Sequence, residues 1–370
     1  MDHNTQKLSP EALYQPFQLG RITLANRMVM APLTRNRAET GNVPGPMTID
    51  YYAQRAGVGL IIAEATQVSA QAQGYYATPG VHSPEQIAAW KKVTDAVHAK
   101  GGKIFLQMWH TGRMSHTAFQ PGEKAPVAPS AIRADAKTFI PGEGYVDTST
   151  PRALETAEIA GIVQDFRTAA RNAIEAGFDG IEVHGAHGYL LDAFLRDGAN
   201  HRTDAYGGSV ENRARFLLEV MAAVTAEIGA DRVGVRLSPV SPVNDSKESN
   251  PQPLFEYVVR EIAKLKPVYI HVVEGHTGGP RDNAPFDYAA LHRLYDGVWM
   301  VNNGYTKEMA QEAVASGQAD LVSFGRLMIT NPDLPRRFQQ NAPLNEPYKD
   351  APLYGGVGPH GYTDYPSLSA

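Results

Sequence analysis

Short apolar runs alternate along the chain with longer segments in which apolar residues recur at helical spacing. The short runs are rich in β-branched and aromatic residues and end at glycine, proline or polar positions. This pattern is typical of parallel strands that are buried on both faces. It predicts strands at residues 28–32, 59–65, 103–109, 180–184, 232–238, 268–273, 298–301 and 321–325.

Each predicted strand is followed by an amphipathic segment with helix start and stop signals. In one of them Ser83 stands at an N-cap position, Pro84 and Glu85 suit the first turn, and Gly101 is a stop. The predicted helices cover residues 49–55, 83–101, 156–175, 212–228, 253–266, 287–296, 306–316 and 333–340.

This alternation predicts an α/β protein with a (β/α)₈ TIM barrel, a single domain over residues 1–370 with long strand-to-helix loops. A doubly wound open sheet is the alternative, but that fold usually carries a GxGxxG turn after its first strand. Here Ala31–Thr34 follows instead. The longest irregular stretch, residues 110–151, is rich in proline, glycine and serine, and we expect it to be a lid or binding excursion.

Composition then narrows the classes of function. The 370 residues carry 34 basic and 39 acidic side chains, and the net charge of −5 disfavours nucleic acid as a partner. The absence of cysteine excludes disulfides, thiolate metal sites, iron–sulfur clusters and cysteine nucleophiles. No apolar run approaches the roughly 18 residues that span a bilayer, and the polar start does not resemble a signal peptide. We therefore expect a soluble, cytoplasmic protein with no membrane partner.

In a barrel of this kind the active site lies at the carboxyl ends of the strands. Nearly every predicted strand ends in polar residues that a core would not favour, and these are amides, cations and imidazoles more than carboxylates. They are Thr34, Glu64, Gln107, Trp109, His110, His184, His187, Arg236, His271, Glu274, Asn302, Asn303 and Arg326. Such a lining suits an anionic ligand with many hydrogen-bonding groups.

The pairs Asn303–Gly304 and Gly325–Arg326 follow the last two predicted strands. These loops are the usual phosphate site of such barrels, because glycine lets backbone N–H groups approach an anion and arginine balances its charge. In the alternative interpretation both glycines only make tight turns and Arg326 lies on the surface. The predicted register favours the phosphate site.

His184, His187 and Tyr189 form a third candidate group, at the end of the fourth predicted strand. Imidazoles three residues apart can converge on one oxygen atom, with the phenol nearby as a proton donor. Two alternatives stay open from spacing alone: histidines that only cap a helix start, and a metal site. No cysteine is present to complete a metal site, and we expect no metal.

Several longer motifs resemble those of the Old Yellow Enzyme family of flavin-dependent ene-reductases. The most specific is HGAHGYLLDAFLRDGANHRTDAYGGSVENRARF, at residues 184–216. The others are NRMVMAPLTRNRA, YYAQRAGVGLIIAEATQVS, GGKIFLQMWHTGRMSH, SFGRLMITNPDLPRRF and GYTDYP. Together, and in this order from about Phe17 to Pro366, they are highly specific. The resemblance is greatest to bacterial members that reduce enones, maleimides and nitrate esters, since the longer dienoyl-CoA reductases carry a cysteine-ligated cluster.

The resemblance implies a single barrel with non-covalent FMN at the C-terminal mouth. Pro32, Leu33, Thr34 and Ala65 would line the flavin ring. Gln107 and Arg236 would meet its pyrimidine side, where Arg236 would stabilise negative charge on the reduced flavin. The phosphate would fall to Asn303, Gly304, Gly325 and Arg326, in agreement with the interpretation of the last two loops.

The resemblance also implies a reaction. NAD(P)H would reduce FMN, which would pass hydride to the β-carbon of an α,β-unsaturated carbonyl or nitro compound. His184 and His187 would bind the substrate oxygen, and Tyr189 would protonate the α-carbon. The substrate pocket would be shaped by Tyr75, Trp109 and Tyr354. Enones, maleimides and nitro compounds are the expected partners, with nitrate esters and nitroaromatics as further substrates, for a monomer or small homo-oligomer.

The chain departs from the family pattern in two places. Many relatives have asparagine where this chain has His187, which leaves ligand preference open. The 110–151 loop and the segment Glu274–Arg293 vary within the family, so substrate range is not carried over from them. NADPH is the commoner donor in the family. Arg281 or Arg133 would be the candidates to meet its extra phosphate, although each suits an ordinary surface charge better.

Three other functions compete with an ene-reductase. One is a flavin-binding redox sensor or storage protein without turnover. The second is a phosphate-binding aldolase or isomerase barrel, which often needs a lysine at a strand end; no predicted strand here ends in lysine. The third is a metal hydrolase, which lacks candidate ligands.

Overall fold

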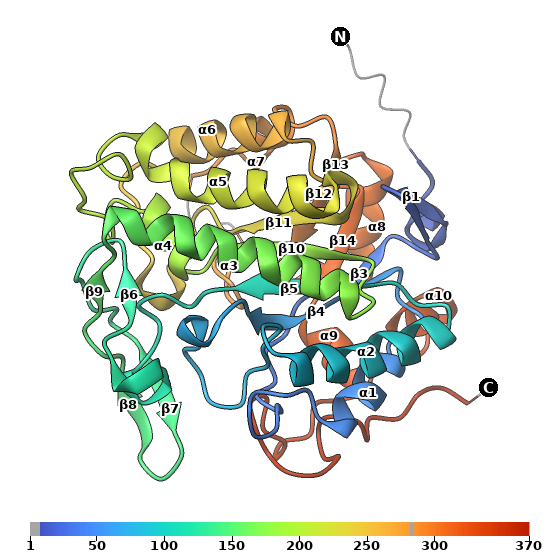
Figure 1. Cartoon of the computed structure of the whole chain (residues 1–370). Coiled ribbons are helices and arrows are strands. Elements are labelled where there is room, and N and C mark those ends of the chain that lie inside the picture. Colours follow the sequence, from blue (N-terminus) through green and yellow to red (C-terminus); the bar gives the residue numbers. More distant parts are fainter. Residues whose placement is uncertain (1–7, 282–284, 370) are drawn as a thin grey trace.

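The structure, a computed structural model, describes residues 8–281 and 285–369. Seven residues of the polar N-terminal stretch, three within the segment Glu274–Arg293, and the last residue lie outside the described ones. Eight parallel strands close into one barrel (Figure 1). In barrel order they are β3 (Met28–Met30), β4 (Leu60–Gln67), β5 (Ile104–Trp109), β10 (Gly180–Gly185), β11 (Val233–Leu237), β12 (Tyr269–Val273), β13 (Val298–Asn302) and β14 (Leu321–Phe324). The predicted barrel and all eight strands are confirmed.

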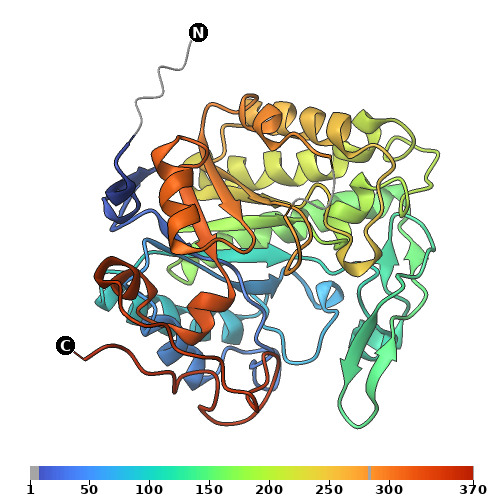
Figure 2. The ribbon, with the colours of Figure 1, turned by 180° about the vertical axis from the view of Figure 1, so that it is seen from behind.

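Helices surround the barrel, as the two opposite views in Figures 1 and 2 show. They are α1 (Pro46–Ala53), α2 (Pro84–Ala99), α3 (Thr156–Glu175), α4 (Leu190–Leu195), α5 (Val210–Ile228), α6 (Pro251–Lys264), α7 (Tyr288–His292), α8 (Lys307–Ala315), α9 (Arg326–Thr330) and α10 (Leu334–Gln340). The cap on α2 is the predicted one: the Ser83 hydroxyl accepts from the Gln86 backbone N–H. Within the described residues, no helix has both the length and the apolar composition to cross a membrane.

Three helices differ from the sequence prediction. The helix expected at 287–296 is only five residues long, because the chain turns after His292 and buries Tyr295, whose hydroxyl bonds to the Pro267 carbonyl. The short helices α4 and α9 were not expected. All six residues of α4 are buried, so the alternation of apolar and polar positions that marks a surface helix is absent there.

The stretch at residues 110–151 is not irregular throughout, so only that part of the sequence prediction is wrong. It contains an antiparallel ribbon, β7 (Lys137–Ile140) with β8 (Gly144–Asp147), which projects from the body of the molecule in Figure 1. It also contains β6 (Val127–Ala128), which pairs with β9 (Arg152–Ala153) just beyond the excursion. The strands of the ribbon are only four residues long, too short for the pattern of residues to stand out from a loop.

The amino-terminal end of the barrel is filled with apolar side chains. A hairpin of β1 (Phe17–Leu19) and β2 (Ile22–Leu24) supplies Leu19 and Leu24, which pack in one cluster with Phe105 and Tyr269 inside the barrel. The Phe105 and Tyr269 rings lie 6.0 Å apart and nearly parallel. Inside the barrel, the polar side chains lie on the other side of this apolar cluster, toward the carboxyl ends of the strands.

Gly234 leaves the room that the Tyr269 ring fills. A Cβ atom at position 234 would lie 2.2 Å from this ring, far inside van der Waals contact. We therefore expect Gly234→Ala to lower the free energy of unfolding by about 1–3 kcal/mol through overpacking, measured by denaturant titration. The control is Gly161→Ala on the exposed face of α3, where no atom lies within 4 Å; it should raise stability by about 0.5–1 kcal/mol. Equal effects of the two substitutions would contradict the packing argument.

Candidate active site

The carboxyl ends of neighbouring strands bring a set of buried polar side chains to one rim of the barrel. Gln107 and Trp109 come from β5, His184 from β10, Arg236 from β11 and Asn302 from β13, and all five are buried. His184 is the register partner of Arg236, so the imidazole and the guanidinium start from adjacent strand positions. The structure thus brings these strand-end residues together on this part of the rim.

The turn after β10 carries His187 and Tyr189. His187 and Gly188 both have left-handed backbones, with φ of 60° and 73°. Such a backbone is strained at His187 but not at glycine. Hydrogen bonds hold the turn: the His187 N–H donates to Ser238 Oγ, and the Gly188 N–H donates to Asp192 Oδ2. The buried Arg196 pairs with the same Asp192 carboxylate at 3.0 Å. Tyr189 is then the N-cap residue of α4.

Four rings form an aromatic cluster beside this turn. The Tyr189 ring lies edge-on to Trp109 at 4.8 Å and to His184 at 4.9 Å. Tyr75 stacks on Trp109 at 5.6 Å, and the Tyr75 and Tyr189 hydroxyls are 3.2 Å apart. The structure thus brings together Tyr75, Trp109, His184 and Tyr189, as predicted.

Burial sets the protonation of these groups. It raises the pKa of Tyr189 to about 12, although the hydrogen bond from Tyr75 works against this rise. Burial and the nearby Arg236 guanidinium hold the pKa values of His184 and His187 well below the ordinary value. At neutral pH the phenol therefore keeps its proton and both imidazoles are neutral.

Several buried polar atoms at the rim have no hydrogen-bond partner within the described part of the chain: His184 Nδ1, Trp109 Nε1 and Arg236 Nε. Buried polar groups in folded proteins are nearly always hydrogen-bonded. His187 differs, because its Nε2 lies 2.8 Å from Thr277 Oγ1. Arg236 also donates from Nη2 to Asn302 Oδ1 at 2.9 Å. The open donors indicate a ligand with acceptor atoms at this rim.

The predicted phosphate residues lie on the loops after β13 and β14. Gly304 has φ of 67° and open space where a Cβ atom would lie, and the Arg326 side chain is exposed. The Asn303 amide is already used: its Nδ2 donates to the carbonyls of Glu274 and His276, and its Oδ1 accepts from the Gly278 N–H. Asn303 thus has only its backbone to offer a phosphate, a point that the sequence did not indicate.

The remaining predicted cofactor residues lie at the ends of β3 and β4. Pro32 and Ala65 are buried, and Leu33 and Thr34 are half-buried. The register of β4 against β5 shifts between Ala63 and Thr66, an irregularity of the kind often found beside active sites. Ala65 lies within this irregularity.

Tyr354 is the predicted pocket residue that the structure does not bury. Its side chain is 63% exposed. It still lies near enough to Tyr75 and Tyr189 to raise the pKa of both phenols. We therefore place Tyr354 at the outer edge of the site rather than in its wall.

The segment that carries Tyr354 is anchored by residues that the sequence analysis did not single out. The buried Arg35 guanidinium lies beside the stacked rings of Tyr51 and Tyr362, 5.3 and 5.0 Å from their centroids. It also donates to the carbonyls of Leu353 and Gly361. Arg35 and Tyr51 are within the quoted motifs, but only the fold shows what they hold.

Glu64 lies beneath this anchor, next to Ala65. Its side chain is buried, and the Tyr52 hydroxyl is 3.3 Å from Oε1. Burial raises the pKa of Glu64 to about 7, even though the Arg35 backbone and guanidinium favour its ionised form. Glu64 is thus a carboxyl group that changes charge near neutral pH at the edge of the site.

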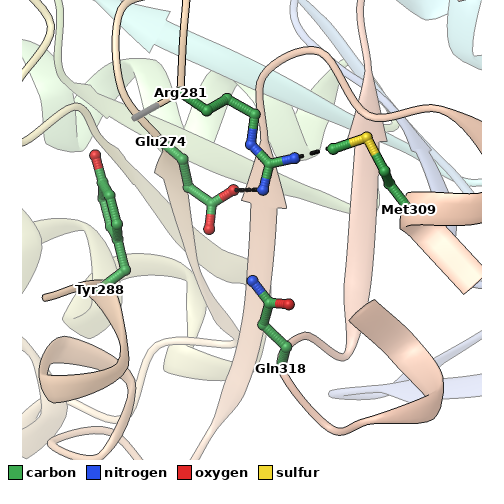
Figure 3. Close-up of a pocket in the computed structure, with 5 residues that line it drawn as sticks. All are labelled: Glu274, Arg281, Tyr288, Met309 and Gln318. Carbon is green, nitrogen blue, oxygen red and sulfur yellow. Dashed lines mark hydrogen bonds and ion pairs between the residues drawn. The ribbon is translucent and has the colours of Figure 1, made fainter. Parts of the chain in front are cut away.

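A separate pocket of about 490 Å³ lies outside this cluster, lined by Glu274, Arg281, Tyr288, Met309 and Gln318 (Figure 3). Arg281 pairs there with Glu274 at 2.9 Å, and its guanidinium lies over the Tyr305 ring. Arg133, the other candidate for the extra phosphate of NADPH, lies 3.5 Å from Asp147. Both arginines thus have acidic partners in the structure. Among the described residues, no group of three His, Cys, Asp or Glu side chains is placed to hold a metal ion.

Comparison with known proteins gives consistent matches over nearly the whole chain. The model of the NADH:flavin oxidoreductase / NADH oxidase family matches residues 12–345. The chain is 48% identical to 12-oxophytodienoate reductase 1 of Oryza sativa subsp. japonica over 375 residues, which cover 100% of this chain and 97% of that protein.

Solved structures agree. Morphinone reductase in complex with tetrahydroNAD matches with a TM-score of 0.91 and 46% identity, over 97% of this chain and 98% of that one. The Old Yellow Enzyme homologue from Zymomonas mobilis matches with a TM-score of 0.90 and 41% identity, over 96% of this chain and 100% of that one. The described fold is thus shared with these oxidoreductases.

The free energies of unfolding of the wild type and of Glu64→Gln should depend differently on pH. The folded chain keeps a proton on Glu64 up to about pH 7, whereas the unfolded chain loses it near 4.5. Protonated Glu64 therefore costs the wild type no stability below about pH 4.5. Between about pH 4.5 and pH 7 the free energy of unfolding falls by about 1.4 kcal/mol per pH unit. The variant lacks this loss, so it should match the wild type at pH 4.5 and exceed it by up to roughly 3 kcal/mol at pH 8. Thermal unfolding at both pH values measures this, and a difference that is constant with pH would contradict it.

Proposed function

Because the chain belongs to the NADH:flavin oxidoreductase / NADH oxidase family, in its Old Yellow Enzyme group, and is an FMN-dependent oxidoreductase, we propose that it is an ene-reductase. It would use NADPH or NADH to reduce α,β-unsaturated carbonyl or nitro compounds. The observation that carries the proposal is the convergence of His184 and the Tyr189 phenol at 4.9 Å ring separation beside His187.

The residues present fit FMN. Arg236 is a buried cation whose Nε has no partner among the described residues. Its free N–H and its charge suit the electron-rich edge of a heterocycle. Leu33 and Thr34 are half-buried at the end of β3, where a ring system would cover them. Gly304 leaves open space, and Arg326 supplies a positive charge for a phosphate. Bound at these residues, FMN would supply the hydride-transfer chemistry between the nicotinamide and the second substrate.

The imidazoles would bind and polarise the substrate oxygen. Neutral imidazole donates one N–H, so His184 and His187 together can give two hydrogen bonds to a carbonyl or nitro oxygen. These bonds strengthen as negative charge develops on that oxygen, and burial makes them stronger than they would be in water. The contact between His187 and Thr277 Oγ1 orients the second imidazole.

Tyr189 would hold the proton that the α-carbon receives. The phenol keeps this proton at neutral pH because burial raises its pKa to about 12. The Tyr75 hydroxyl, 3.2 Å away, stabilises the phenolate that forms when the proton leaves. The stacked rings of Tyr75 and Trp109 would exclude water from one side of the substrate.

The proposed activity predicts two colour changes under anaerobic conditions. NADPH or NADH should bleach the yellow protein, and cyclohexenone or a maleimide should then restore the yellow colour in a stopped-flow absorbance trace. Bleaching by the nucleotide with no return of colour for any enone, maleimide or nitro compound would indicate a flavin-binding redox sensor without turnover. Comparing the two nucleotides in the first step also decides the donor.

Tyr189→Phe should slow reoxidation by enones by about 10²-fold, the contribution that general acid catalysis typically makes, while leaving reduction by NAD(P)H within about twofold. The phenyl ring keeps the packing against Trp109 and His184 and lacks only the hydroxyl group that carries the proton. Tyr145→Phe, on the exposed β8 strand, is the matched control and should change neither rate. An equal fall in both half-reactions would remove Tyr189 from the acid role.

A further inference from the structure

Four polar side chains cross the interior of the barrel just below the rim. Gln107 Nε2 donates to Glu182 Oε1 at 2.8 Å, and Glu182 Oε2 lies 2.8 Å from His271 Nδ1. His271 Nε2 lies 2.8 Å from Ser323 Oγ. The four residues come from β5, β10, β12 and β14, and none is more than 2% exposed. They form a polar layer above the apolar cluster that contains Phe105 and Tyr269.

Stability alone does not explain the polar layer. Removing a carboxylate from water costs several kcal/mol, and apolar side chains of similar volume are often as stabilising as a buried ion pair. Only Gln107 of the four residues has been assigned a role in the proposed function. The roles of Glu182, His271 and Ser323 therefore need an explanation.

The direction of each hydrogen bond follows from chemistry. Burial lowers the pKa of His271, although Glu182 opposes this, so its imidazole is neutral. The neutral ring donates from Nδ1 to the carboxylate and accepts from the Ser323 hydroxyl at Nε2. The negative charge of Glu182 lies near the buried Arg236 guanidinium, and this charge favours the charged form of Arg236.

This arrangement decides which way the Gln107 amide points. A carboxylate accepts hydrogen bonds and cannot donate one, so it selects the NH₂ end of the amide. The amide oxygen then points away from Glu182, and it makes no hydrogen bond to any residue that the structure describes. Without Glu182 the two ends of the amide could exchange places.

We propose that Glu182, supported by His271 and Ser323, is a positioning residue that holds the Gln107 amide with its oxygen toward the cofactor, where it accepts from the single N–H of the flavin pyrimidine ring. That ring carries one N–H between two carbonyl groups. An amide held in one orientation recognises this pattern, and a freely turning one does not. The inference rests on the proposed function only in taking FMN as the ligand.

The test uses FMN and N3-methyl-FMN, in which a methyl group replaces this N–H. Flavin-free full-length protein is titrated with each, and the dissociation constants are read from flavin fluorescence. For the wild type we expect the methyl compound to bind at least about tenfold more weakly, the effect of one lost hydrogen bond and a steric conflict.

In Glu182→Leu/His271→Leu the layer loses the buried carboxylate together with the imidazole that pairs with it, so the barrel should still fold, which a thermal unfolding curve checks. FMN should bind about tenfold more weakly, and the preference over the methyl compound should shrink to under about threefold. Glu182→Gln keeps an acceptor for Gln107 and should retain at least half of the wild-type preference on a logarithmic scale. If the double variant does not fold, Glu182→Met decides, because His271 can still bond to Ser323 in its other tautomer.

The outcomes separate the two hypotheses. A folded variant with wild-type preference for FMN, or one that loses affinity for both compounds equally, overturns the positioning role of Glu182. Wild-type protein that binds neither compound overturns FMN as the ligand, and with it the proposed function. If the wild type prefers FMN over the methyl compound and the folded variant does not, the result supports both the positioning role of Glu182 and FMN as the ligand.

Discussion

Closure of eight parallel strands is the constraint on which the rest of this structure depends. It brings all carboxyl strand ends to one rim and forces the side chains inside the barrel to contact one another instead of water. The amino-terminal half meets this condition with apolar packing, in which Phe105 and Tyr269 stack and Gly234 makes room for the ring. The upper half meets it with hydrogen bonds, from Gln107 to Ser323.

The same lack of water sets the chemistry of the rim. Desolvation disfavours whichever form of a group is charged, so it is the largest cause that keeps His184 and His187 neutral and Tyr189 protonated. Desolvation thus keeps two neutral imidazoles that can donate to a substrate oxygen, and a phenol that can donate a proton to a substrate carbon. Arg236 is the exception, because a guanidinium keeps its charge even when it is buried. Glu182 supplies a nearby negative charge that favours it.

The loops around the rim are held by buried polar contacts from outside the barrel. Asp192 and Arg196 fix the turn that carries His187, and Arg35 fixes the segment that carries Tyr354. Asn303 uses its whole amide to tie the loop after β12 to the loop after β13. A site built in this way can orient a substrate with side chains on turns, because each turn is attached to a strand end by hydrogen bonds.

The sequence by itself determined the eight strands, most of the helices, and the residues at the strand ends, because apolar runs and helical spacing are local properties of the chain. It also determined the family, through long motifs such as residues 184–216. It did not determine α4, which is apolar on every side, or the ribbon of β7 and β8, whose strands are short. Only the tertiary structure decided that Asn303 turns its amide away from the proposed phosphate site, that Tyr354 is exposed, and that Glu182 bonds to Gln107 and His271, 75 and 89 residues away in the chain. Contacts over such separations arise when the barrel closes, and no local pattern of residues encodes which side chains then meet.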